Sequence, residues 1–134
     1  MASMTLDPLM TLAVVGLHLR GEPRNGELLE RGGTFLRPAR TTAAYRLYRL
    51  PSGVPGLVRR APGHRIDVEL WTLPYAGAGS LLDRIAKPLT LGRVELEDGA
   101  QVTGFLCEAY AADDAIDITA SGGWRRFLQE GLRA

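Results

Sequence analysis

The feature that most constrains this chain is an apolar run that leads directly into a loop containing two glycines. Residues 11–15 read Thr-Leu-Ala-Val-Val, which has the length and composition of a buried strand. Gly16 and Gly21 follow, with His18 between them. Glycine lets a backbone approach a ligand closely or adopt positive φ, and exposed amide N–H groups in such a loop can bind an anion. The segment predicts a carboxylate- or phosphate-binding loop in which His18 supplies a proton; the alternative is a structural turn with a buried histidine.

The rest of the chain reads as short strands and a few short helices. Proline and glycine separate short β-type stretches at 34–37, 45–50, 57–58 and 66–71. Residues 76–86 are typical of a helix that Pro88 ends. Residues 94–102 alternate around Asp98-Gly99 and predict a hairpin, whereas Gly122-Gly123-Trp124 opens a short terminal helix. This order favours an α+β fold, a small mixed β-barrel with short helices.

Length and charge narrow the function classes. The chain has 134 residues, which suits one domain, and we expect that domain to span residues 11–134 after a disordered extension at 1–10. The formal net charge of +1 offers no field for nucleic acid, and no apolar run reaches the roughly 20 residues of a membrane span. A single cysteine, Cys107, cannot form an internal disulfide or a metal site, so we expect a core cysteine, a cytoplasmic protein, and no metal or cofactor.

The glycine loop also resembles a known family. Residues 15–21, Val-Gly-Leu-His-Leu-Arg-Gly, followed by Asn25, are similar to the substrate loop of the C-terminal domain of allophanate hydrolase, a variant of the gamma-glutamylcyclotransferase-like fold. Further similar segments follow in the same order at 45–48, 55–59, 68–74, 88–96, 104–108 and 117–125. The resemblance implies the cyclotransferase-like fold. It also implies decarboxylation of N-carboxycarbamate, or of a related small dicarboxylate, beside a separate amidase in urea or allophanate breakdown.

One position departs from the cyclotransferase pattern. That chemistry needs a general acid or base, a glutamate in a Leu-Asp-x-x-Glu-Gly pattern on the helix in the middle of the chain. Here the pattern reads Leu82-Asp83-Arg84-Ile85-Ala86-Lys87, with Ala86 at the glutamate position. A cyclotransferase would need another carboxylate, and Glu69 or Glu108 are the replacements considered. We expect Glu69, which alternates with apolar residues, to face outward.

The site expected from the loop and the resemblance has His18 as the catalytic acid. Amide donors of the loop would hold one carboxylate, and Arg20 or Arg46 could neutralise the second. The full set of expected substrate-binding residues is Gly16, Leu17, Leu19, Arg20, Gly21, Tyr45, Arg46, Tyr48, Pro88, Leu89 and Gly92. Two other function classes stay open: a module that binds a metabolite or associates with an amidase without catalysis, and a cyclotransferase. A homodimer is a further possibility.

Overall fold

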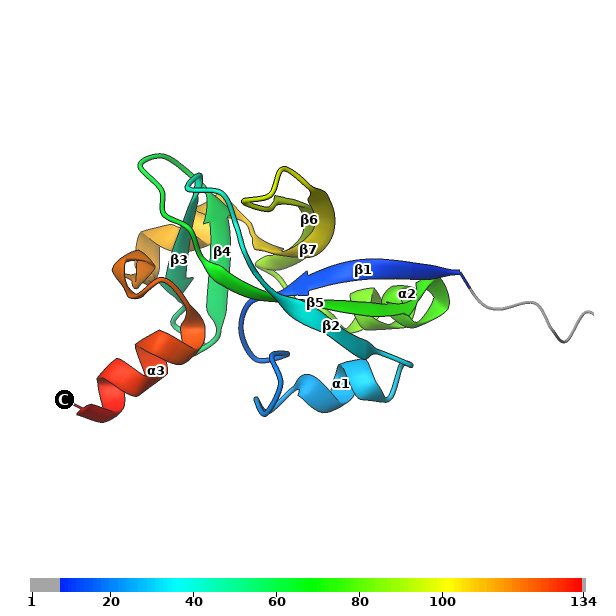
Figure 1. Cartoon of the computed structure of the whole chain (residues 1–134). Coiled ribbons are helices and arrows are strands. Elements are labelled where there is room, and N and C mark those ends of the chain that lie inside the picture. The colour runs from blue at the N-terminus through cyan, green and yellow to red at the C-terminus, as the bar shows by residue number, and fades with distance from the viewer. Residues whose placement is uncertain (1–7, 134) are drawn as a thin grey trace, which may run out of the picture.

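The computed structural model describes residues 8–133 (Figure 1). Its strands are β1 (Leu9–Val14), β2 (Thr34–Arg40), β3 (Tyr45–Arg49), β4 (Pro55–Arg59), β5 (Asp67–Pro74), β6 (Leu89–Glu95), β7 (Gln101–Cys107) and β8 (Ile116–Asp117). Its α-helices are α1 (Asn25–Leu29), α2 (Tyr75–Arg84) and α3 (Trp124–Arg133), and two 3₁₀ turns span Ala109–Asp114 and Thr119–Ser121. The expected α+β class is confirmed.

The strands form two sheets. One has five strands in the order β2-β5-β1-β7-β6, and the other has three in the order β4-β3-β8. The edge strands β2 and β6 of the larger sheet approach each other only at their ends, through a bridge between Thr41 and Leu96. Because the edges do not pair along their length in the described residues, the closed barrel expected from the sequence is not confirmed. The larger sheet is instead curled, with its edges in contact at one point.

Strand β1 lies at the centre of the larger sheet and explains why its sequence is apolar. It pairs antiparallel with β5, where Leu12 faces Trp71, and parallel with β7, where Leu12 faces Thr103. Leu12 and Val14 are completely buried. A strand flanked on both sides and covered on both faces reads as a continuous apolar run, as this one does. The loop that begins at Gly16 therefore follows a buried strand at the centre of the larger sheet.

The hairpin around Asp98-Gly99 is confirmed, whereas the first strand begins two residues before the predicted start at Thr11. Glu95 of β6 faces Gln101 of β7, and Gly99 in the turn has φ of 93°. Strand β1 begins at Leu9, which pairs with Pro74, so the last residues of the expected disordered extension are ordered. Their pairing with the end of β5 fixes them although the sequence alone showed no partner. Residues 1–7 of that extension lie outside the described residues.

Helices α1 and α2 lie next to each other at one end of the molecule, and α3 lies at the other end (Figure 1). The loop between β1 and α1 runs between these two ends. Strand β4 of the smaller sheet packs against β7 of the larger one, so the loop faces a junction between the sheets. Across residues 8–133, no helix has the length and apolar character needed to span a lipid bilayer.

Candidate active site

The loop from Gly16 to Asn25 is held in shape by two glycines and one side chain. A Cβ on Gly16 would lie 1.9 Å from Pro55 Cγ, so only glycine lets β1 pass so close to β4. Gly21 has φ of 79°, in the left-handed region that other residues rarely adopt. The Asn25 side-chain amide donates to the backbone carbonyl of His18 over 2.8 Å. These contacts fix the backbone on either side of the histidine.

His18 is buried and has partners on two sides. Its Nε2 lies 2.8 Å from Glu27 Oε1, and its ring stacks on Phe105 with 4.7 Å between the centroids. The residue is only 8% exposed. Burial lowers the pKa of His18 below its usual 6.5, although the hydrogen bond and the negative charge of Glu27 act in the opposite direction. The imidazole is therefore predominantly neutral at pH 7.

Glu27 determines which ring nitrogen of His18 is free. Burial would raise the pKa of Glu27, but the hydrogen bond with His18 and the positive charges of Arg24 and Arg84 act in the opposite direction, and the pKa is lowered. An ionised Glu27 can only accept, and Nε2 of a neutral His18 must then carry the hydrogen. Within residues 8–133, Nδ1 of His18 has no hydrogen-bond partner. That nitrogen is the one left to exchange a proton.

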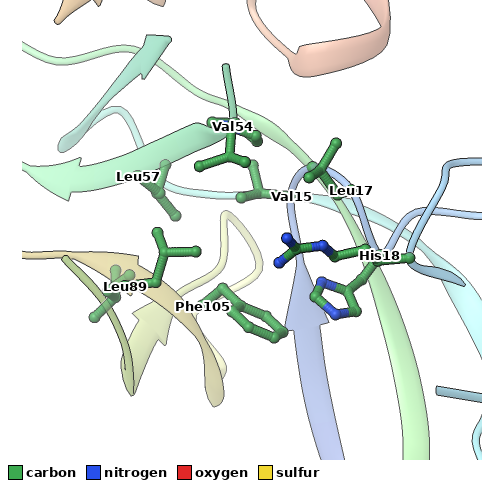
Figure 2. Close-up of a pocket in the computed structure, with 11 residues that line it drawn as sticks. Val15, Leu17, His18, Val54, Leu57, Leu89 and Phe105 are labelled. Atoms are coloured by element: carbon green, nitrogen blue, oxygen red, sulfur yellow. The ribbon is translucent and has the colours of Figure 1, made fainter. Parts of the chain in front are cut away.

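Two adjoining cavities lie beside this pair. The inner recess has about 30 Å³ and the outer cavity about 240 Å³, and five residues line both: His18, Arg24, Val54, Leu89 and Phe105. Figure 2 shows Val54, Leu57 and Leu89 grouped on one side of the recess, with the His18 and Phe105 rings on the other. Sites for drug-sized ligands usually measure roughly 300–1,000 Å³. These cavities therefore suit a ligand of only a few heavy atoms.

The outer cavity has a positively charged lining. Arg24, Arg84 and Lys87 contribute three cations, and Glu27 contributes one anion. Arg84 lies 4.0 Å from Glu27, whereas in the described part of the chain neither Arg24 nor Lys87 has a carboxylate within ion-pair distance. With His18 neutral, the charged side chains at this cavity sum to +2. The amide N–H groups of Leu17 and His18 also make no hydrogen bond within residues 8–133. The arrangement can bind a small anion next to a histidine whose Nδ1 is free to exchange a proton.

Five of the expected site residues lie at these cavities. Gly16 and Leu17 line the inner recess, Pro88 lines the outer cavity, and His18 and Leu89 line both. They come from the loop after β1 and from the start of β6, which are far apart in the sequence. The structure thus places the glycine loop beside the segment near Pro88.

The other expected residues lie elsewhere: Leu19, Arg20, Gly21, Tyr45, Arg46, Tyr48 and Gly92 line neither cavity. Tyr45 is completely buried, and its hydroxyl accepts a hydrogen bond from the Glu95 amide over 2.9 Å. Arg46 forms an ion pair with Asp117 on the surface of the smaller sheet. These two side chains already have partners, which is why their strand does not supply the ligand contacts that the sequence suggested.

Arg20 points to the opposite side of the loop, toward Glu69. Its backbone N–H donates to Glu69 Oε1 over 2.9 Å, and its Nε lies 3.2 Å from Oε2. Arg125 of α3 and the indole of Trp71 also donate to this carboxylate, over 2.9 and 3.2 Å. Glu69 is 3% exposed, so the expectation that it faces outward is wrong. Its four donors balance the loss of hydration and hold its pKa below the usual value despite burial.

Sequence reasoning missed Glu27, Arg24, Phe105 and Arg84 as cavity residues. Glu27 follows His18 by nine residues, and the turn between them is too irregular for any periodicity to place the two side chains together. Phe105 reads as an ordinary strand residue, and it reaches the ring of His18 only because β7 pairs with β1. A charged turn directly after a glycine loop was the one available signal for Arg24 and Glu27.

The family model for the allophanate hydrolase C-terminal domain matches residues 10–129. Urea amidolyase of Saccharomyces cerevisiae is 36% identical over 126 residues, which cover 88% of this chain and 7% of that protein. A structure of a uropathogenic E. coli-specific protein is 36% identical, with a TM-score of 0.87, and the alignment covers 91% of this chain and 97% of the other. Allophanate hydrolase of Kluyveromyces lactis is 34% identical, with a TM-score of 0.86, over 92% of this chain and 21% of that enzyme.

The fold alone is shared more widely. A gamma-glutamyl cyclotransferase structure is 12% identical with a TM-score of 0.54, over 82% of this chain and 70% of that one. That likeness confirms the cyclotransferase-like fold and carries no activity. The chain spans only 7% of the urea amidolyases that it matches, and nearly all of the E. coli chain. The match to the family model, over most of the chain, shows that this protein belongs to the allophanate hydrolase C-terminal domain family.

Proposed function

We propose that this domain binds a small dicarboxylate beside His18 and catalyses its decarboxylation, with N-carboxycarbamate as the expected substrate. The observation that carries the proposal is the buried His18–Glu27 pair at the wall of a small cavity lined with cations. Substrate identity comes from the family, whose relatives are named urea amidolyase and allophanate hydrolase. A separate amidase would supply the substrate, and a cytoplasmic location and a homodimer remain expectations.

The chemistry requires a proton at nitrogen. When a carboxylate leaves N-carboxycarbamate as CO2, the N–C bond breaks and its electron pair stays on nitrogen. Protonation of that nitrogen turns it into the amino group of carbamate, so a general acid lowers the barrier. His18 can deliver this proton from Nδ1, because Glu27 occupies Nε2. Glu27 also stabilises the imidazolium while it carries the charge.

Substrate binding would raise the pKa of His18 and so favour its protonation once the substrate is bound. In the free protein burial keeps the imidazole predominantly neutral. A dianion bound in the cavity raises the pKa of a neighbouring histidine, because it stabilises the protonated form. The amide N–H groups of Leu17 and His18 are available to hold the carboxylate that stays on the product.

The direct test couples this protein to an amidase that converts allophanate to N-carboxycarbamate. CO2 release is followed with and without the protein, because the uncatalysed reaction is a substantial background. The proposal predicts release faster than background in proportion to the amount of this protein. Release at the background rate over a wide range of protein concentrations would contradict it.

A binding module without catalysis is the second candidate, and one observation favours it. Because His18 is predominantly neutral at pH 7, little imidazolium is available as a general acid unless a ligand raises the pKa of His18. In that case malonate, which copies the two carboxylates, would bind without any CO2 release in the coupled assay. The third class, a cyclotransferase, gains nothing from Glu69, whose carboxylate already accepts from Arg20, Trp71 and Arg125. Release of 5-oxoproline from gamma-glutamyl amino acids would establish it.

A further inference from the structure

Arg20 and Arg46 leave the second carboxylate of a dicarboxylate without a partner at this site. Arg20 contacts Glu69 behind the loop, and Arg46 contacts Asp117 on the smaller sheet. Both guanidinium groups therefore have acidic partners, and neither residue lines the His18 cavities. A ligand with two negative charges needs cations that are closer and unpaired.

We infer that Arg24 and Lys87 form the subsite for the second carboxylate, a proposal that rests on the proposed function of this cavity. Both residues line the outer cavity together with His18. Arg24 lies in the turn after the glycine loop and Lys87 lies between α2 and β6, so the two cations reach the cavity from different elements. One ligand bridging them would be held on two sides.

Charge at the cavity favours two negative charges over one. Arg24, Arg84 and Lys87 against Glu27 give a sum of +2 with a neutral His18. Arg84 is already engaged with Glu27 at 4.0 Å, which leaves Arg24 and Lys87 as the cations without an acidic partner in the part of the chain described. A dianion neutralises this surplus, whereas a monoanion leaves one positive charge unpaired.

The subsite also gives the cavity a selection rule. A dicarboxylate can place one carboxylate at the Leu17 and His18 amides and the other at Arg24 and Lys87, with the reacting atom between them and near His18. A zwitterionic amino acid would bring an ammonium group next to Arg24 or Lys87, where like charges repel. The predicted ligand class is therefore small dianions with two carboxylates and no ammonium group.

The test is calorimetric binding of malonate and acetate to the intact chain. Arg24→Gln and Lys87→Gln should each weaken malonate binding about tenfold, the effect of losing one charge-assisted contact, and should change acetate binding by less than about threefold. Lys87→Arg should retain most of the malonate affinity. Arg60→Gln is the matched control, because Arg60 is exposed and lines neither cavity. Thermal unfolding confirms that each variant is folded.

Two results would overturn the subsite. One is a wild-type protein that binds malonate no more tightly than acetate. The other is a pair of variants that lose malonate and acetate affinity by the same factor, which indicates a general field instead of a second contact. The readout is independent of turnover: selective malonate binding without CO2 release would leave the subsite standing and remove the decarboxylase.

Discussion

The two sides of the Gly16–Asn25 loop each carry a glutamate, and the two glutamates have different surroundings. Behind the loop, Glu69 accepts from the Arg20 backbone and from the Arg20, Arg125 and Trp71 side chains. In front, Glu27 contacts His18 at 2.8 Å and Arg84 only at 4.0 Å, beside a cavity. Both carboxyl groups have lowered pKa values and both border a cavity, but only Glu27 contacts a titratable ring, whereas Glu69 is surrounded by permanent donors.

The different surroundings indicate different roles: Glu69 stabilises the loop, whereas Glu27 positions His18. A perturbed pKa marks either an ion-pair network or a reactive group, and the shift alone does not distinguish them. Glu69 has its oxygens filled by donors, so it anchors the loop and has no capacity left for a ligand. Glu27 holds one nitrogen of His18 and leaves the other unpartnered. In the proposed function, the back of the loop anchors the backbone through Glu69, and the front delivers the proton through His18.

The largest effect should come from His18→Asn, which keeps a polar side chain but removes the group that exchanges a proton. We expect the rate of CO2 release above background to fall by roughly 10²- to 10⁴-fold. Malonate affinity should change far less. The coupled CO2 assay measures the rate, and calorimetry measures the binding.

The chain provides a matched control in its second histidine. His64 is exposed and lines neither cavity, so His64→Asn should leave the rate unchanged. Equal rates for wild type and His18→Asn would show that His18 is not the acid.

On the back of the loop, Glu69→Ala should lower the free energy of unfolding by about 3 kcal/mol, because buried donors on Trp71 and on the Arg20 backbone lose their acceptor. Urea unfolding measures this change. Glu30→Ala is the control. The side chain of Glu30 is 75% exposed and makes a single long contact of 3.8 Å with Arg31, so its loss should lower the free energy of unfolding by less than about 0.5 kcal/mol. Equal losses for the two variants would mean that Glu69 is not an anchor.

Gly16→Ala tests the close approach between the loop and β4. The new methyl group would meet Pro55 Cγ at 1.9 Å, and we expect a loss of about 2 kcal/mol in the free energy of unfolding. Malonate binding should weaken as well, because Gly16 and Pro55 both line the inner recess. Gly79→Ala in α2 meets nothing within 4 Å and should instead stabilise the protein by about 0.5 kcal/mol. A neutral Gly16→Ala would show that the two strands can separate freely.

The smallest effect concerns Glu27→Gln, which keeps a hydrogen-bond acceptor and removes the charge. The negative charge of Glu27 raises the pKa of His18, so its loss lowers that pKa further and leaves less imidazolium at neutral pH. We expect CO2 release to fall about tenfold at pH 7.5. The loss should shrink as the pH decreases, because more His18 is then protonated. A loss that stays constant with pH would exclude this electrostatic role.

The sequence alone predicted the parts of the site that lie on one short segment. The sequence predicted a buried strand before Gly16 and a glycine loop that contains His18. The residues Asp98-Gly99 predicted the hairpin, because this pair is typical of tight β-turns. Arg20 was misplaced because an irregular loop has no periodicity that assigns side chains to one side, and the partner that decides its side, Glu69, is 49 residues away. The same limit hid Phe105, whose contact with His18 depends on strand pairing.

The cavity cations illustrate the limit in another way. Lys87 is the only lysine in the chain, but it lies far from His18 in the sequence. No sequence pattern therefore predicted that the two residues line the same cavity. The sequence also suggested Arg46 as a ligand contact. In the structure Arg46 lies on β3 of the smaller sheet and lines neither cavity. The packing of segments that are far apart in the sequence, which local patterns do not encode, determines which cations reach the cavity.

The most direct test of the account is the titration of His18 by NMR in the free protein and with malonate. The free protein should show a His18 pKa below 6.5, because burial disfavours the charged ring. Saturating malonate should raise that pKa, since a dianion beside the ring stabilises imidazolium, while the His64 signals serve as the internal reference. A His18 pKa that does not respond to bound malonate would contradict the claim that the front of the loop binds a dianion and delivers a proton to it.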